Sequence, residues 1–390
     1  MIFFALNPRQ AVVDAAVAAE ATLVAVADAE TLSTLTLDEN PIEVSDPLDP
    51  LEVARRLEPV INENRNRYGA LCVGLGDDSS QVAALVNSSL GLAEGRFACF
   101  SNLEVMRDKH RLRQVLPPGS KLNGLHQMAA LDAHPENDLR NIFEKSPHGI
   151  VIKPNSGAGS RDVHSIQSEQ DLQSLELTPD SYLVEQRFAG PEYSVESISW
   201  EGSHQPLVVT EKTTGGTNGL VETGHLQPAQ IPDEHRDRLF DAVRTVLDHA
   251  GYQTGLSHIE FILEEGQPRL IEAHGRVGGD YIADLMKWSV GASAFEILFR
   301  TQQNQRLPES EPVGEHAAVH FPDLRRWSHT DQQWIDLMHE NNMVKEAEIL
   351  KDRDSRGDIT CSVERHAYVI LAGNKIDDLT QALQNLKVNS

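Results

Sequence analysis

Two short apolar segments, 256–263 and 268–273, constrain the fold of this chain more than any other feature. They are joined by a turn that contains Gly266, and together they predict a β-hairpin. The register of this hairpin decides where two glutamates lie. A three-residue loop places Glu260 opposite Glu272, with Cβ atoms roughly 5 Å apart on one face. A two-residue loop places the two carboxylates on opposite faces. Gly266 is compatible with both loops.

In the first register, Glu272, His274 and Arg276 also share one face, because side chains alternate along a strand. Two opposed carboxylates repel each other unless a proton or a cation lies between them. Mg²⁺ prefers oxygen ligands and would remove this repulsion. The segment alone leaves open that the hairpin is an acidic surface facing solvent.

A glycine-rich turn at 275–280 follows the second strand. Arg276 opens this turn, and an arginine beside a metal site is well placed to stabilise charge on a transferring phosphoryl group. The alternative is that Gly278-Gly279 only turns the chain from the strand into a helix at 281–288.

The segment 150–160, IVIKPNSGAGS, predicts a buried strand that ends at Lys153 and leads into a turn of small residues. Small residues let backbone N–H groups approach an anion, and the lysine adds a positive charge. The chain contains no Walker pattern, GxxxxGK followed by Ser or Thr. A plain strand and turn, with the lysine reaching solvent, is the competing interpretation.

Another predicted strand, 181–185, ends at Glu185, and the chain then crosses through Gly190-Pro191 to Glu192. Backbone groups exposed at such a crossing can bind the edge of an adenine, and a carboxylate can accept hydrogen bonds from ribose hydroxyls. Taken alone this signal is weak, because acidic residues at strand ends usually face solvent.

The first hundred residues alternate predicted strands and helices, which indicates a small open sheet with helices on both faces. Gly74-Leu75-Gly76 lacks the third glycine of a dinucleotide-binding turn, so an acidic helix N-terminus at Asp77-Asp78 is the better interpretation. The other expected elements are strands at 2–6, 22–26, 70–73 and 193–200, helices at 9–19, 81–90, 102–115, 233–250 and 376–386, and a long loop at 212–227.

In their order along the chain, these segments resemble the ATP-grasp superfamily, and most closely the L-amino-acid ligases and related dipeptide synthetases. The resemblance is clearest over about 100–300, where it also includes Asp108-Lys109 and Arg113. It implies an α/β (α+β) chain with three parts. These are an N-terminal domain with an open parallel sheet at 1–100, a central lid domain at 101–190 and a C-terminal mixed-sheet domain at 191–390, which carries the metal and substrate sites.

The resemblance also assigns roles to individual residues. It implies that ATP is bound by Lys109, Lys153, Ser156, Gly157, Ser160, Glu185, Phe188 and Glu192, with Glu185 at the adenine and Glu192 at the ribose. It implies metal ligation by Glu260, Glu272 and His274, substrate binding by Glu222, His258, Arg276, Gly279 and Asp280, and catalysis by Arg276 and Lys153.

Position 274 departs from the family, where asparagine is common. Imidazole is a poor ligand for a hard cation, so His274 either contacts phosphate or substrate, or belongs to a site that also accepts Mn²⁺.

The implied activity is ATP-dependent joining of a small-molecule carboxylate to an amine, with amino acids as the expected substrates. An acyl-phosphate is the intermediate, ADP and phosphate are released, and the loop at 212–225 closes over the substrate. One alternative keeps the fold but activates bicarbonate or formate, as carboxylases and formate-activating enzymes of purine or biotin metabolism do. Another is a nucleotide-binding module without turnover, which would not require Arg276.

Composition excludes some partners. The net charge of −25 disfavours binding to nucleic acid or to anionic membranes. No apolar run approaches the ~20 residues of a membrane span, and the N-terminal ten residues lack the basic start of a signal peptide. Three cysteines without metal-binding spacing fit a reducing cytoplasm. The family resemblance implies a homodimer.

Overall fold

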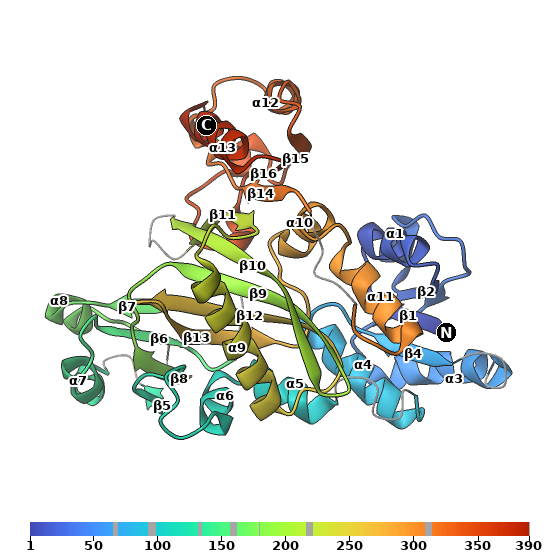
Figure 1. The fold of residues 1–390 in the computed structure, drawn as a ribbon, viewed down its shortest axis with the longest axis horizontal. Coiled ribbons are helices and arrows are strands. Elements are labelled where there is room, and N and C mark those ends of the chain that lie inside the picture. Colours follow the sequence, from blue (N-terminus) through green and yellow to red (C-terminus); the bar gives the residue numbers. More distant parts are fainter. Residues whose placement is uncertain are drawn as a thin grey trace.

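The computed structural model describes residues 1–64, 69–92, 99–131, 135–156, 162–178, 180–215, 221–308 and 314–389. The strands in these ranges form three sheets (Figure 1). The first sheet, in blue, lies at one end of the molecule and the second, in green, at the other. The third runs through the middle, and its last strands, in orange and red, lie at the top of the view with the C-terminal helices. Within the described residues, the helices are too short or too polar to span a bilayer.

The first sheet is parallel, as predicted, with the strand order β3-β2-β1-β4. Its apolar strands are buried between helices, and Phe3 and Phe4 are almost inaccessible to solvent. Its strands are β1 (Ile2–Leu6), β2 (Thr22–Ala27), β3 (Ile42–Glu43) and β4 (Ala70–Val73), and its helices are α1 (Gln10–Ala18), α2 (Ala29–Ser33), α3 (Pro50–Asn64) and α4 (Asp77–Ser89). Helix α4 begins at Asp77 and Asp78, where the helix dipole favours negative charge. The predicted acidic helix N-terminus is therefore confirmed.

The second sheet is antiparallel, with the order β5-β8-β6-β7. It is small, and one of its faces is covered by an apolar cluster that includes Leu139, Ile152 and Val184. Its elements are β5 (His126–Leu131), α7 (Glu136–Glu144), β6 (Ile150–Pro154), β7 (His164–Ile166), α8 (Glu169–Gln173) and β8 (Asp180–Gln186).

The third sheet has the order β13-β12-β9-β10-β11-β14-β16-β15, and all its pairs among the described strands are antiparallel. The α/β class is confirmed, but this sheet is antiparallel where a mixed sheet was predicted. Its strands are β9 (Glu192–Trp200), β10 (Ser203–Gly215), β11 (Val221–Gln227), β12 (Gly255–Glu264), β13 (Gln267–His274), β14 (His316–His320), β15 (Val344–Ile349) and β16 (Ala367–Gly373).

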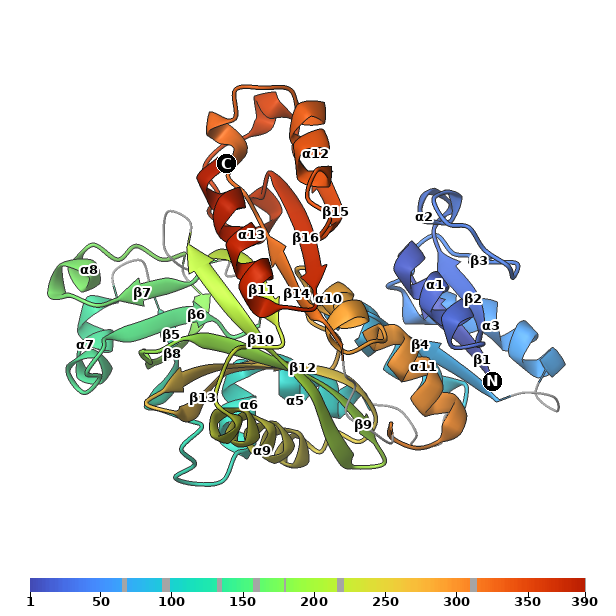
Figure 2. The same ribbon diagram turned by 45° about the horizontal axis from the view of Figure 1, so that its top comes forward.

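Helices cover the apolar face of the third sheet. Helices α5, α6 and α9 lie together beneath it in both views (Figures 1 and 2) and share a core with Val195, Ile259 and Phe261. The remaining helices are α5 (Phe100–Arg107), α6 (Lys109–Val115), α9 (Asp233–Ala250), α10 (Ile282–Ser289), α11 (Ala294–Asn304), α12 (Asp331–His339) and α13 (Ile376–Asn389), with 3₁₀ turns η1 (Leu324–Arg326), η2 (Arg353–Ser355) and η3 (Ser362–Glu364).

Two predictions of local structure were wrong. The helix predicted at 102–115 is broken at Asp108, whose side chain accepts a hydrogen bond from the Arg111 N–H at 2.7 Å and caps α6. A loop was predicted at 212–227, but its described residues, 212–215 and 221–227, belong to strands, and the end of β10 pairs with β11 as far as Leu226. Sheet neighbours on both sides of this hairpin override its weak strand propensity.

The hairpin of β12 and β13 combines features of both predicted registers. Its turn has two residues, Glu265 and Gly266, both with positive φ, so Glu264 lies opposite Gln267. That turn alone would separate the two glutamates. Ile271 is an extra residue in β13, however, and this β-bulge restores the pairing of Glu260 with Glu272.

Candidate active site

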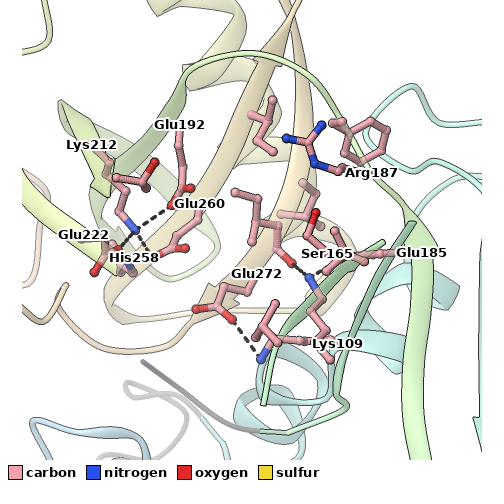
Figure 3. Close-up of a pocket in the computed structure, with 18 of the residues that line it drawn as sticks. Lys109, Ser165, Glu185, Arg187, Glu192, Lys212, Glu222, His258, Glu260 and Glu272 are labelled. Carbon is pink, nitrogen blue, oxygen red and sulfur yellow. Dashed lines mark hydrogen bonds and ion pairs between the residues drawn. The ribbon is translucent and has the colours of Figure 1, made fainter. Parts of the chain in front are cut away.

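A cavity of about 500 Å³ lies between the second and third sheets. Its lining includes side chains from α6, β6, β8, β9, β10, β12, β13 and the turn after β13 (Figure 3). A cavity of this size accommodates a nucleotide-sized ligand. The alternation along β12 explains its polarity, because His258, Glu260 and Ile262 face the cavity whereas Ile259 and Phe261 enter the core.

Lys153 and Glu185 line one end of the cavity, and Arg113 is buried against Glu185. We define these three residues as the cationic cluster. Lys153 forms an ion pair with Glu185, and Arg113 Nη2 lies 3.1 Å from the other oxygen of this carboxylate. Arg113 also donates to the Ile271 carbonyl at 2.7 Å, and Lys153 donates to the same oxygen at 3.3 Å. The bulge at Ile271 therefore supplies a carbonyl that anchors both cations.

The side chains of this cluster are buried, and burial and charge act on them in opposite directions. Burial lowers the pKa of Lys153, although Glu185 counteracts part of this effect. Burial would raise the pKa of Glu185, but Arg113 and Lys153 hold it below its usual value. The cluster thus keeps one anionic carboxylate between two cationic side chains.

The middle of the cavity holds the opposite arrangement, a carboxylate cluster that we define as Glu192, Glu222 and Glu260 around Lys212 (Figure 3). Lys212 Nζ lies 3.2 Å from Glu192, 2.7 Å from Glu222 and 2.5 Å from Glu260. Pairing within the sheet explains part of this geometry, since Lys212 on β10 is directly opposite Glu192 on β9.

Three carboxylates around one ammonium group are not neutralised. Burial, reinforced by Glu260 and Glu222, raises the pKa of Glu192 to about 7 although Lys212 opposes the shift. Burial would lower the pKa of Lys212, but the three carboxylates raise it well above its usual value. The lysine therefore stays charged, and the cluster carries excess negative charge.

Glu272 faces Glu260 across the hairpin and has its own cationic partners. Lys109 Nζ lies 2.9 Å from one oxygen of Glu272, and His274 Nε2 lies 3.0 Å from the other. The second nitrogen of His274 lies 2.9 Å from Asp77. Burial would lower the pKa of His274, but Glu272 and Asp77 raise it. With a carboxylate at each nitrogen, His274 has no free nitrogen for a metal in this arrangement.

Asp77 also accepts a hydrogen bond from Arg276 Nε at 2.9 Å. On the neighbouring strand, His258 lies between Glu196, at 2.5 Å, and Glu260, at 2.8 Å. Burial would lower the pKa of His258, but these carboxylates raise it to about 9.

Asp280 and Glu222 line the cavity, and a buried group of residues packs against them. Arg365 lies 2.7 Å from Asp280 and 3.3 Å from Glu222, and it packs on the Phe321 ring. His225 is buried beside them, and neither of its ring nitrogens has a hydrogen-bond partner. Burial lowers the pKa of His225 to about 3, so its imidazole is neutral.

The structure brings most of the predicted site residues to one cavity. The residues that line it are Lys109, Lys153, Glu185, Phe188, Glu192, Glu222, His258, Glu260, Glu272, Arg276, Gly279 and Asp280. Ser156 is exposed and does not line the cavity, and Gly157 and Ser160 lie outside the described residues, as does part of the loop at 212–225.

Three parts of the site were not predicted from the sequence: Lys212, Arg365 and the contact between Asp77 and Arg276. Lys212 lies in the stretch that was predicted as a loop. Arg365 is separated from Asp280 by 85 positions and Asp77 from Arg276 by 199, so local sequence carries no signal for either contact.

One group of three residues in the described ranges has the spacing of a metal site, with ligand atoms within 4.8 Å: Glu222, His225 and Asp280. Both of its carboxylates already bind Arg365. Glu260, Glu272 and His274 do not form such a group among the described residues. Two carboxylates suffice for Mg²⁺ where substrate phosphates and water supply the remaining oxygens.

Comparison with known proteins is consistent with this geometry. Residues 146–284 match the model of the ATP-grasp domain family. Mouse carnosine synthase 1 is 24% identical over 233 residues, which is 55% of this chain and 28% of that protein. Alanine–anticapsin ligase of Bacillus subtilis strain 168 is 28% identical over 225 residues, 50% of this chain and 46% of the relative. The chain thus spans less than half the length of these relatives.

The fold has solved counterparts. The crystal structure of an L-amino acid ligase from Bacillus licheniformis superimposes with a TM-score of 0.73 at 17% identity and covers 100% of this chain and 97% of that one. At this identity the likeness shows the fold alone, and the fold is that of the ATP-grasp enzymes.

Proposed function

We propose that this chain, which carries an ATP-grasp domain at residues 146–284, is an ATP-dependent ligase that joins the carboxylate of one amino acid to the amine of another. The observation that carries the proposal is the position of the carboxylate pair, Glu260 and Glu272, in one cavity with the cationic cluster and Arg276. Such a cavity has groups for a nucleotide, a divalent cation and a developing negative charge.

The cationic cluster is the proposed nucleotide end. Lys153 and Arg113 share the single carboxylate of Glu185 and leave positive charge for phosphate groups. Phe188 lies beside them as an apolar surface for a base, with the Arg269 guanidinium over its ring at 5.4 Å. Glu192, at the next crossing of the chain, is the proposed partner of the ribose.

Glu260 and Glu272 are the proposed ligands of Mg²⁺. Their present partners support a cation site, because each glutamate binds a lysine ammonium group. Glu260 binds Lys212, and Glu272 binds Lys109. When bound, the cation would neutralise charge on the transferring phosphoryl group. His274 is then a positioning residue for Glu272 rather than a ligand.

The chemistry follows from the poor leaving group of a carboxylate. A carboxylate oxygen of the acid attacks the γ-phosphorus of ATP, which breaks the bond to ADP and forms an acyl-phosphate. The amine then attacks the carbonyl carbon, the carbon–oxygen bond to phosphate breaks, and the amine loses a proton. Arg276 lines the cavity beside Glu272 and would stabilise the negative charge that develops.

The group around Asp280 is the proposed site of an amino acid's ammonium. Glu222 and Asp280 supply carboxylate oxygens, and neutral His225 supplies a buried nitrogen without a partner. Arg365 holds the two carboxylates in place and offsets part of their mutual repulsion.

The experiment is to mix the protein with ATP, Mg²⁺ and pairs of amino acids and to analyse the products by mass spectrometry. ADP, phosphate and a new amide are expected. ADP release that requires bicarbonate or formate would instead support an ATP-grasp carboxylase or formate-activating enzyme. Release of AMP and pyrophosphate would contradict the proposal. Three expectations from the sequence remain predictions for this chain. They are domain limits at 100 and 190, a cytoplasmic location and a homodimer.

A further inference from the structure

The turn after β13 carries Arg276, and it is held on both sides. On one side, a Cβ atom at Gly275 would lie 2.3 Å from Leu103 Cδ2 of α5, so the chain approaches that helix as closely as glycine allows. On the other, the Gly278 N–H donates to Glu196 at 3.0 Å. The backbone of the turn is therefore fixed, but these contacts do not set the direction of the Arg276 side chain.

Asp77 sets that direction. Its Oδ2 accepts from Arg276 Nε at 2.9 Å, and its Oδ1 lies 2.9 Å from His274 Nδ1. The Val277 carbonyl accepts from Arg276 Nη1 at 2.6 Å. Among the described residues, Nη2 has no partner, and Arg276 lines the cavity. The guanidinium is thus held by two of its nitrogens, and the third remains for an anionic ligand.

Asp77 is well suited to this role because it is itself fixed. It lies in the first turn of α4, a helix of 13 residues whose Val82, Ala83 and Val86 are buried against the first sheet. It reaches Arg276 across 199 positions of sequence. The contact therefore joins the first sheet to the reacting end of the cavity.

We propose that Asp77 is a positioning residue of the ligase reaction, which holds Arg276 and His274 in the geometry that phosphoryl transfer requires. The inference rests on the proposed function. Through His274 it extends to Glu272, whose carboxylate His274 contacts at 3.0 Å. Small displacements of such groups reduce rates strongly, by about 100-fold for roughly 1 Å.

Asp78 provides a matched control. It lies in the same first turn of α4 and has the same charge at the helix N-terminus, but it pairs with Arg107 at 2.7 Å, is largely exposed and does not line the cavity. Asp77→Asn and Asp78→Asn therefore remove the same charge from the same helix end. Only the first loses the carboxylate that faces Arg276.

The kinetic test compares these variants in the full chain. Asp77→Asn is expected to lower kcat about 10- to 100-fold with the KM for ATP within about threefold of wild type. Asp78→Asn is expected to match wild type, and both variants should melt alike. In an Arg276→Ala background, Asp77→Asn should lower kcat by a smaller factor than in wild type, because only the contact with His274 remains to be lost. An unchanged kcat, or an equal loss in both backgrounds, would overturn the proposal.

A second readout does not depend on turnover. Solvent exchange of the Arg276 Nε–H, followed by side-chain NMR, should be faster for Asp77→Asn than for wild type, because this hydrogen is donated to Asp77, and unchanged for Asp78→Asn. Unchanged exchange in Asp77→Asn would overturn the positioning role even if the ligase activity is established. Faster exchange in a protein that forms no ADP with any substrate would instead support the positioning of Arg276 and refute the proposed function.

Discussion

The two charged clusters of the cavity are built from the same residue types in opposite proportions. In the cationic cluster, Arg113 and Lys153 share one carboxylate, Glu185. In the carboxylate cluster, one lysine, Lys212, is shared by three carboxylates. The cationic cluster and Lys212 are buried, and the three glutamates around Lys212 are only partly exposed, so bulk water relieves neither imbalance fully.

The difference indicates what each part of the cavity would bind. Excess positive charge favours an anion such as the phosphates of a nucleotide, and excess negative charge favours a divalent cation or an ammonium group. An unbalanced charge in a protein interior is costly unless a ligand of opposite charge neutralises it. Predictions that separate the clusters therefore test the whole account.

The largest expected effect comes from the carboxylate cluster. Glu260→Gln should lower kcat at least about 1000-fold, because the variant loses a proposed Mg²⁺ ligand at the transferring phosphoryl group. Glu211→Gln is the control, since Glu211 precedes Lys212 on β10 and faces the other side of the sheet. Steady-state ADP release measures both. Loss of the cooperative melting transition in Glu260→Gln would show that Glu260 has a structural role instead.

Loss of the lysine should lower the free energy of unfolding more in the carboxylate cluster than in the cationic cluster. Lys212→Met leaves three partly buried carboxylates without their shared cation and should cost about 3 kcal/mol. Lys153→Met leaves Glu185 with Arg113 and should cost about 2 kcal/mol. Urea unfolding measures both values. Mg²⁺ should raise the melting temperature of Lys212→Met more than that of Lys153→Met. Equal losses and equal responses to Mg²⁺ would remove the contrast between the clusters.

Arg276→Ala should show whether this arginine acts on the transferring phosphoryl group or on bound ATP. We expect kcat to fall about 100-fold, with the KM for ATP within about threefold, because this guanidinium would act on charge that develops during transfer. The matched control is Arg244→Ala on the exposed side of α9, which pairs with Asp241. A large rise in KM at constant kcat would place Arg276 at the bound nucleotide instead.

The smallest effect concerns the pH dependence of stability. Burial lowers the pKa of His225 to about 3, against about 6.5 when unfolded. As the pH falls from 6.5 towards 3, the unfolded chain gains a proton at His225 that the folded chain does not, so stability is lost in this window. Between pH 7 and pH 5 wild type should lose up to about 2 kcal/mol more than His225→Gln.

Urea unfolding at the two pH values measures this difference. His249→Gln, at the exposed end of α9, should keep the wild-type dependence. A wild-type loss no larger than that of His225→Gln would show that His225 is protonated in the folded protein.

Much of this site was accessible from sequence because strands carry their side chains at a fixed period. The facing of Glu260 and Glu272 was one of two predicted registers, but the bulge at Ile271 that produces it has no signal in the local residues. Lys212 escaped because its stretch is rich in threonine and glycine and forms a strand only between sheet neighbours. Arg365 and Asp77 bind the cavity residues Asp280 and Arg276 from distant parts of the chain, and only the tertiary fold defines these contacts.

In the proposed reaction, ATP activates a carboxylate by transfer of its γ-phosphoryl group to a carboxylate oxygen. The most direct test uses an acid labelled with oxygen-18 in both carboxylate oxygens, with ATP, Mg²⁺ and the amine. One labelled oxygen is expected in the released phosphate and the other in the amide. Label in AMP, or phosphate without label beside a formed amide, would contradict it.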